Sequence, residues 1–251
     1  DWFILDLLGS ALVFISIEKL WALRREQPVF RPAWQTDLAH FAVNHLLVGL
    51  LLVLTNALVH HLLGWAAHDG LRGWVQALPL WAAVPLALLV ADLAQYTLHR
   101  AYHRVPWLWR FHAVHHSIET LDWLAGSRMH LAEVLATRTL VLGLFYVAGF
   151  SRAAIDIYIV IVGFQAVFNH ANVRWPVRGR LARAFGWLIV TPAFHHWHHS
   201  REAQALDRNF AAHFAFIDHL LGTAARTDTD WPREYGTVGN EVPEGFIAQT
   251  L

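Results

Sequence analysis

Three short segments of the chain concentrate histidine at spacings that suit metal binding. They read HRAYH (99–103), FHAVHHS (111–117) and FHHWHHS (194–200), and they hold half of the 18 histidines. On a helix, residues three and four apart share one face, so each segment would direct its imidazoles one way. An imidazole buried without a hydrogen-bond partner is costly, whereas neutral imidazole is a common ligand of transition metals. The pattern therefore predicts metal binding rather than packing.

The number of these histidines bears on the number and kind of metal ions. The residues that share helical faces are His99, His103, His112, His115, His116, His195, His198 and His199. Because one metal ion takes about four to six donors, eight imidazoles predict two ions. His196 lies one position off the shared face and is a weaker candidate. Zinc has no redox chemistry, whereas two irons held by neutral imidazoles could activate O₂ and abstract hydrogen from an unactivated carbon.

Composition places these segments in a membrane protein. Hydrophobic residues make up 56% of the 251 residues and charged residues 15%, against about 25% charged in a soluble domain. The formal net charge of zero gives no indication of a nucleic-acid partner. The chain has no cysteine, which excludes disulfides, thiolate metal sites and a cysteine nucleophile. We expect residues 1–251 to form one integral-membrane domain.

Five apolar segments are the elements that would position the histidines. They cover 2–21, 36–63, 74–98, 131–150 and 153–170. A membrane span needs about 20 apolar residues, so the sequence predicts an all-α polytopic membrane bundle of four or five spans. The last two segments are short and carry Glu133, Arg138 and Asp156. They are expected to form a spanning hairpin or a re-entrant pair, with a buried hairpin of a soluble protein as the alternative.

Arginine gives the expected orientation. Arginines follow the first, third and fifth apolar segments, whereas the loops on the opposite side hold one each. The positive-inside rule then places both histidine-rich regions on the cytoplasmic face. Residues 99–130 and 171–251 would thus form a cytoplasmic helical cap that holds a two-metal histidine site.

The histidine segments resemble those of a known family. HRAYH, FHAVHHS, FNHANV (168–173) and TPAFHHWHHS (191–200) are similar to the histidine boxes of the fatty acid hydroxylase/sterol desaturase superfamily. Members are integral-membrane oxygenases with a dimetal centre, usually assigned as diiron. The resemblance covers about 92–223 and includes DRNF (207–210) and FIDHLLGT (216–223). It is closest to bacterial sterol-desaturase-like proteins and alkylglycerol monooxygenases, which implies a bacterial inner membrane.

The resemblance also implies a ligand set and cofactors. The eight box histidines would be ligands, and His170 stands where the family has a further one. His130, in SRMHLAE, resembles an H-P-x-E segment with leucine replacing proline, and either a ligand or a supporting role is open to it. The cofactor would be two iron ions, with zinc as the alternative in a recombinant sample. Tetrahydrobiopterin is implied by resemblance only, through the alkylglycerol monooxygenases.

Polar residues near the boxes are candidates for holding the ligands. Asp92 falls on one helical stripe with His99 and His103. We expect it to accept a proton from a ligand imidazole, with a carboxylate facing a polar cavity as the alternative. Asp207 and Asn209 follow the last box and are expected to act in the same way as Asp92.

The expected function is hydroxylation of a lipid C–H bond in a fatty acyl chain, sterol or ether lipid. O₂ would be the oxidant, and electrons would come from a ferredoxin, a cytochrome b5-type protein or a pterin. Desaturation at the same site is the alternative. A zinc-dependent membrane hydrolase and a metal transporter are rivals from other classes. A transporter would bind its cargo near the midplane of its spans, and a zinc hydrolase needs about three protein ligands.

Overall fold

The protein is all-helical over the residues that its structure, a computed structural model, describes: 2–227, 230–239 and 242–250. The predicted all-α fold class is confirmed. The helices are α1 (Trp2–Leu20), α2 (Trp34–Leu63), α3 (Asp69–Gln76), α4 (Leu80–Arg104), α5 (Pro106–His116), α6 (Leu131–Ala148), α7 (Arg152–His170), α8 (Arg180–Leu188), α9 (Pro192–His198), α10 (Phe216–Leu221) and α11 (Phe246–Thr250). Single 3-10 turns occur at Gly64–Ala66 and Ala125–Ser127.

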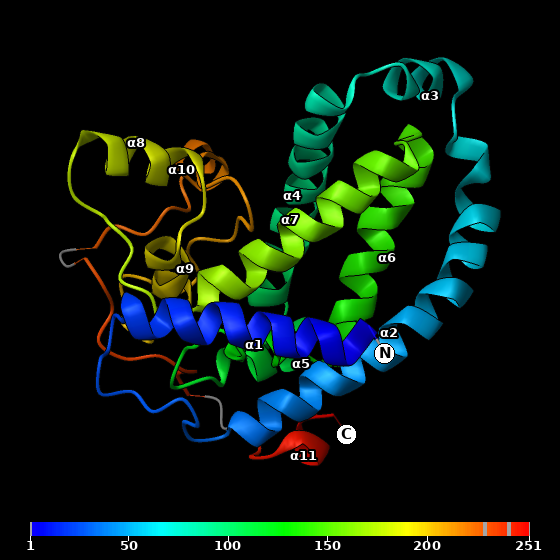
Figure 1. Ribbon diagram of the computed structural model, residues 1–251. Helices are drawn as coiled ribbons and strands as arrows, with labels where there is room; N and C mark the ends of the chain where they lie inside the picture. Colours follow the sequence, from blue (N-terminus) through cyan, green and yellow to red (C-terminus); the bar gives the residue numbers. More distant parts are fainter. Residues whose placement is uncertain (1, 228–229, 240–241, 251) are drawn as a thin grey trace.

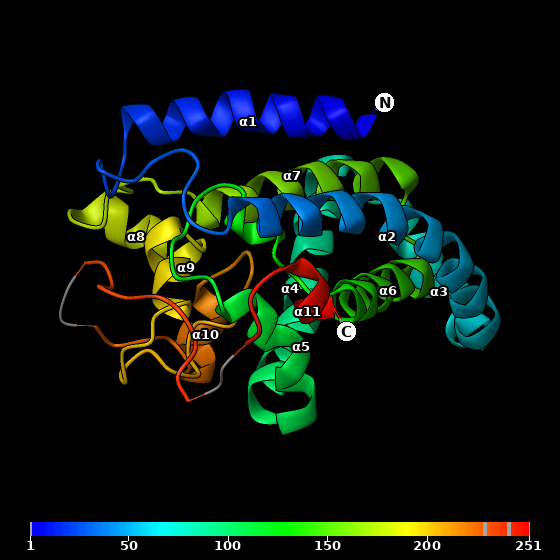
Figure 2. The same ribbon diagram turned by 90° about the horizontal axis from the view of Figure 1, so that it is seen from below.

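Helices α2, α4, α6 and α7 pack into a bundle, and α1 lies along one side of it (Figures 1 and 2). Small side chains let the helices approach closely, because Ala87 and Ala91 of α4 are fully buried. They pack with Val141 and Phe145 of α6 and with Tyr158 of α7. Interdigitation of small and large side chains across helices gives the dense packing typical of protein cores.

Three helices of the described chain, α4, α6 and α7, are long and apolar enough to cross a membrane. Helices α1 and α2 occupy the other two predicted segments, and α1 carries Asp6, Glu18 and Lys19. Large apolar side chains on α1 are exposed, Leu8 to 61% and Leu12 to 73%. The total number of spans stays a prediction.

The third apolar segment is divided differently from the sequence prediction. The predicted range 74–98 begins inside α3, and α4 starts only at Leu80, after Pro79 in an extended conformation. Proline disfavours helical geometry in the residue before it, which separates the two helices. Helix α4 then continues without interruption to Arg104. His99 and His103 therefore lie on the last turns of an apolar helix, and not in a cap that begins at residue 99.

A buried network of charges fixes the loop between α5 and α6. Arg31 pairs with Asp37 and with Asp122, and Arg128 also pairs with Asp37. All four residues are 5% exposed or less. Removing one partner of a buried ion pair costs about 3–5 kcal/mol, because it leaves an uncompensated charge. The network therefore holds residues 117–130 firmly against the start of α2.

Candidate metal centre

All nine predicted histidine ligands come together in two groups at one end of the bundle. Each group offers ligand atoms that lie within 4.8 Å of one another. The five-histidine group is His99, His103, His112, His116 and His198, and the four-histidine group is His115, His170, His195 and His199. The imidazoles come from α4, α5, α7 and α9, and His199 is the C-cap residue of α9.

Local sequence explains how short helices bring these residues together. Helix α4 ends at Arg104, and Pro106 occupies the first turn of α5, where a missing N–H costs nothing. This tight turn brings α5 against α4, so that the rings of His103 and His112 lie 5.0 Å apart. Helix α9 begins in the same way: Pro192 is in its first turn, and the Thr191 side chain accepts a hydrogen bond from the Phe194 N–H.

Backbone carbonyls set the orientation of four of the rings. In each case Nδ1 donates to a carbonyl oxygen, which can only accept, so Nε2 keeps a free lone pair. The pairs are His99 with Phe210 (2.7 Å), His198 with Arg208 (2.8 Å), His115 with Arg128 (3.0 Å) and His170 with Ala166 (2.7 Å). The same arrangement orients histidine ligands in metalloproteins.

Two carboxylates orient two further rings. Asp207 Oδ1 lies 3.2 Å from His103 Nδ1, which is the supporting contact predicted for Asp207. Glu133 Oε1 lies 2.7 Å from His112 Nδ1, and both side chains are 3% exposed. The sequence did not predict this contact for Glu133. Its signal was present, however: an acid at the start of an apolar helix requires a partner.

The Nε2 atoms of the two groups converge at distances that suit cations. His112 Nε2 lies 2.9 Å from that of His99, and His170 Nε2 lies 2.9 Å from that of His195 and 3.2 Å from that of His115. When Nδ1 carries the proton on both rings, such a contact brings two lone pairs together and repels. A metal ion removes the repulsion, since bonds of about 2.1 Å place neighbouring ligand nitrogens about 3 Å apart.

Buried nitrogens without partners point to the same occupant. His103 Nε2 and His198 Nε2 find no hydrogen-bond partner among the described residues. A buried polar atom of this kind requires an explanation, such as a bound ion. The donor set of the two groups therefore fits two metal ions.

Electrostatics favours the ligating form of these rings. Burial lowers the pKa of His112, His115, His116, His195, His198 and His199 well below the usual value for histidine, and neighbouring imidazoles lower it further. A protonated imidazole cannot bind a metal. The centre thus holds these rings in the neutral form that a metal ion requires.

His196 and His130 lie outside both groups. His196 Nδ1 is 2.8 Å from the Tyr235 hydroxyl, and its Nε2 is 3.1 Å from the Ala171 carbonyl. Because both ring nitrogens of His196 are in hydrogen bonds, neither is available to bind a metal. His130 caps α6 through Nδ1, which accepts from the Ala132 N–H at 3.1 Å. His130 belongs to neither group, so the ligand role left open for it is not supported.

The structure corrects the roles expected for Asp92 and Asn209. Asp92 is fully buried and accepts from the backbone N–H groups of residues 212–214, at 2.6–3.1 Å, instead of from an imidazole. Asn209 donates to the Phe194 carbonyl and accepts from the Ala225 N–H. Neither hydrogen-bonds a grouped histidine, because segments distant in sequence supply nearer partners. Asp92 instead supports His99 indirectly, through the segment that contains Phe210.

Fold and site together define an all-helical protein with apolar helices of spanning length and a buried centre of nine histidines. The chain belongs to the fatty acid hydroxylase family, whose model, described as "Fatty acid hydroxylase", matches residues 84–223. This range is more than half of the chain and contains all nine histidines. The family predicted from the histidine boxes is confirmed.

Several curated proteins are similar to the chain. An ornithine lipid hydroxylase of Rhizobium tropici is 30% identical over 70% of this chain and 51% of its own length. A cholesterol 25-hydroxylase of Rattus norvegicus is 30% identical over 86% of this chain and 72% of its own. An alkylglycerol monooxygenase of Danio rerio is 28% identical over 61% of this chain and 32% of its own. The chain thus spans about half the length of the first relative. No solved structure matches it.

Proposed function

We propose that the protein is a membrane-bound oxygenase that hydroxylates a lipid C–H bond with O₂ and external electrons. The observation that carries this proposal is the convergence of nine imidazoles, in two groups, on sites that suit cations. The names of the relatives give support, since they describe hydroxylases or monooxygenases of an ornithine lipid, cholesterol and alkylglycerols.

The two groups would hold two iron ions, the first through five histidines and the second through four. When bound, iron would supply the O₂ activation that oxidation of an unactivated carbon requires. The surrounding chain fixes the rings through carbonyls and carboxylates and limits the access of bulk water, because six of the nine histidines are buried and the other three are half-buried. Zinc fits the donor atoms too, but a zinc hydrolase needs about three protein ligands, and nine exceed that need.

The substrate would be a lipid: a fatty acyl chain, a sterol or an ether lipid. Helices α4 and α7 contribute ligands from their last turns and run from the centre into the apolar bundle. A lipid tail that follows these helices would bring its C–H bonds toward the histidines. Hydroxylation is the first choice of reaction, and desaturation at the same centre is the second.

The arrangement in the membrane is also a proposal. Helices α1 and α2 would add spans to α4, α6 and α7, and the arginine-bearing loops would put the histidine centre on the cytoplasmic side of a bacterial inner membrane. There a ferredoxin, a cytochrome b5-type protein or a pterin such as tetrahydrobiopterin would deliver electrons. Because the chain has no cysteine, labelling of an Ala203→Cys variant with an impermeant maleimide tests this orientation. Labelling of intact cells would contradict it.

The decisive experiment measures oxygen transfer. Purified protein is loaded with iron, reduced and incubated with membrane lipids and ¹⁸O₂, and the lipids are analysed by mass spectrometry. Hydroxylation predicts one ¹⁸O atom in the product, whereas desaturation predicts loss of two hydrogens without label. Cleavage of lipid by zinc-loaded protein without O₂ would favour the hydrolase. Iron-loaded protein that consumed no O₂ and formed no oxidised lipid would rule out the oxygenase.

A further inference from the structure

A second apolar surface lies outside the bundle, and we call it the α8–α10 face. It consists of Leu181, Phe185 and Leu188 of α8, with Leu220 and Leu221 of α10. Their exposed fractions are 88%, 46%, 45%, 72% and 53% in that order. The α8 residues are spaced four and three apart, which puts them on one stripe. Figure 1 shows α8 and α10 side by side. Exposed apolar side chains on two neighbouring helices are typical of an interaction surface.

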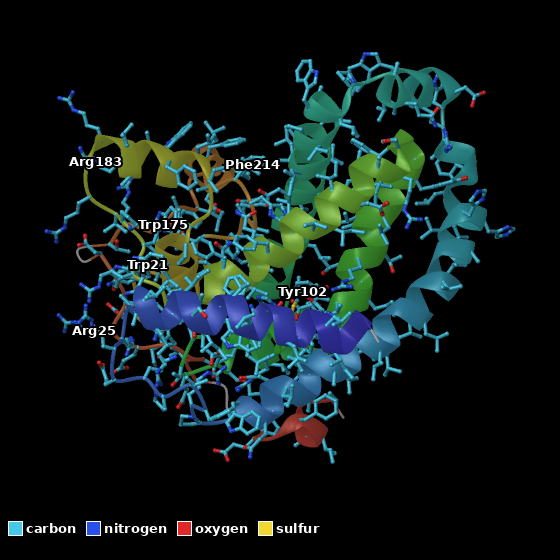
Figure 3. All side chains as sticks on the ribbon, viewed as in Figure 1. Trp21, Arg25, Tyr102, Trp175, Arg183 and Phe214 are labelled. Carbon is cyan, nitrogen blue, oxygen red and sulfur yellow. The ribbon has the colours of Figure 1, made fainter. Side chains whose placement is uncertain are left out.

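The α8 side of this face is rich in positive charge. Residues 157–201 contain no aspartate or glutamate, yet they include Arg174, Arg178, Arg180 and Arg183. Arg178 pairs with Asp230 at 2.8 Å, and Figure 3 shows Arg183 pointing away from the body of the molecule. A surface that joins exposed leucines to arginines complements a lipid bilayer with anionic headgroups.

A hollow at the start of α8 combines the same two chemistries. It has a volume of about 530 Å³ and is lined by residues that include Trp175, Phe185, Arg178 and Arg180. Half of the Trp187 side chain is also exposed, on the neighbouring part of α8. Tryptophan prefers the headgroup layer of a bilayer, and arginine there binds phosphate. The combination would be unfavourable against a second copy of the chain, because two arginine-rich faces repel one another.

We infer that the α8–α10 face docks onto the anionic surface of the bilayer that holds the protein. Leu181, Phe185 and Leu188 enter the boundary between headgroups and acyl chains, and Arg180 and Arg183 contact lipid phosphates. Only residues 189–191 separate α8 from α9, which carries His195 and His198. Docking of α8 therefore fixes the depth of the last histidine segment relative to the lipid.

A single fluorescent label tests the inference, because the chain has no cysteine of its own. Leu181→Cys and, as control, Ala203→Cys in the exposed loop after α9 are labelled with an environment-sensitive probe. Each protein is reconstituted into vesicles of phosphatidylcholine alone or with phosphatidylglycerol. We expect the probe at 181 to shift to the blue and to be quenched by nitroxide lipids, more strongly with phosphatidylglycerol. The probe at 203 should respond to neither lipid.

Charge-removal variants separate the arginines from general effects of charge. Quenching by nitroxide lipids should be stronger in vesicles that contain phosphatidylglycerol. Arg180→Gln with Arg183→Gln, in the Leu181→Cys background, should abolish this difference between the two kinds of vesicle. Arg201→Gln with Arg233→Gln removes the same charge elsewhere and should leave it intact. The inference would be overturned if nitroxide lipids quenched the probe at 181 equally in both kinds of vesicle. It would also be overturned if an aqueous quencher acted on the probes at 181 and 203 to the same extent. Shielding that rises with the protein-to-lipid ratio would indicate a second copy and would also overturn it.

Discussion

Each imidazole in the centre has two nitrogens, and the chain uses them for different purposes. His99, His115, His170 and His198 give Nδ1 to a carbonyl and direct Nε2 into a group. His196 shows the opposite case, since hydrogen bonds occupy both of its nitrogens. The second partner of a ring, and not its place in a motif, therefore separates a candidate ligand from a structural histidine.

The ligand assignment predicts different metal contents for two histidine variants. His115→Ala removes an Nε2 from the four-histidine group, so the purified protein should lose about one of the two metal ions that we propose the groups hold. His130→Asn is the matched control, because asparagine also caps a helix and His130 belongs to neither group. Elemental analysis of both variants measures the result. Full metal content in His115→Ala would contradict the assignment.

Glu133 is predicted to act by positioning His112. Glu133→Ala removes the acceptor 2.7 Å from His112 Nδ1, and loss of such a partner typically weakens metal binding about 10–100-fold. Glu133→Gln keeps an oxygen acceptor and should restore part of the affinity. Competition with a graded series of chelators measures both variants. If Ala and Gln variants bind metal equally well, the positioning role is wrong.

At the scale of elements, the centre depends on a non-helical segment as much as on helices. Residues 208–214 run beside α4, where the carbonyls of Arg208 and Phe210 accept from His198 and His99. Two buried carboxylates hold this segment by its N–H groups: Asp218 binds at Phe210 and Ala211, and Asp92 binds at 212–214. The two carboxylates thus orient the histidines indirectly, by holding the segment whose carbonyls bind the rings.

Asp92→Asn is predicted to destabilise the fold. The amide leaves one oxygen to accept and turns an N–H₂ donor toward backbone donors, so hydrogen bonds to a charged group are lost. We expect the free energy of unfolding to fall by roughly 3 kcal/mol. Thermal denaturation in detergent, monitored by circular dichroism, measures the change. Asp156→Asn breaks an exposed pair with Arg152 and should cost less than about 0.5 kcal/mol; equal losses would contradict the prediction.

At the scale of the whole molecule, the protein is divided between an apolar bundle and a histidine-bearing end. The bundle core of Ala87, Ala91, Val141 and Phe145 contains no metal-binding group. At the other end, four helices meet through imidazoles whose lone pairs face one another. Packing therefore stabilises the first part without metal, whereas the proposed metal ions would offset the repulsion in the second.

Metal removal should therefore loosen one end of the molecule only. After treatment with a chelator, hydrogen exchange is expected to accelerate in α5 and α9. These two helices carry six of the nine grouped histidines when His199, the C-cap residue of α9, is included. Exchange in the part of α6 around Val141 and Phe145 should not change, because packing alone protects it. Mass spectrometry of peptides locates the effect. Uniform acceleration, or none, would show that the centre is not a local metal-dependent unit.

The sequence by itself determined the fold class, the family and the identity of the nine clustered histidines. Apolar length specifies a helix of spanning dimensions, and spacings of three and four place imidazoles on one helical face whatever the partner. Only the tertiary structure decided how the nine divide into groups of five and four. Neighbours in sequence separate there, since His115 and His116 belong to different groups.

Tertiary structure also decided which polar side chains support the ligands. Glu133 on α6 contacts His112 on α5, whereas Asp92 binds a segment 120 residues further along the chain. Helical periodicity carries no information on contacts between elements, because these depend on how the helices cross. The physical reason is one of range: periodicity fixes the direction of a side chain on its own helix, and long-range packing fixes what that side chain meets.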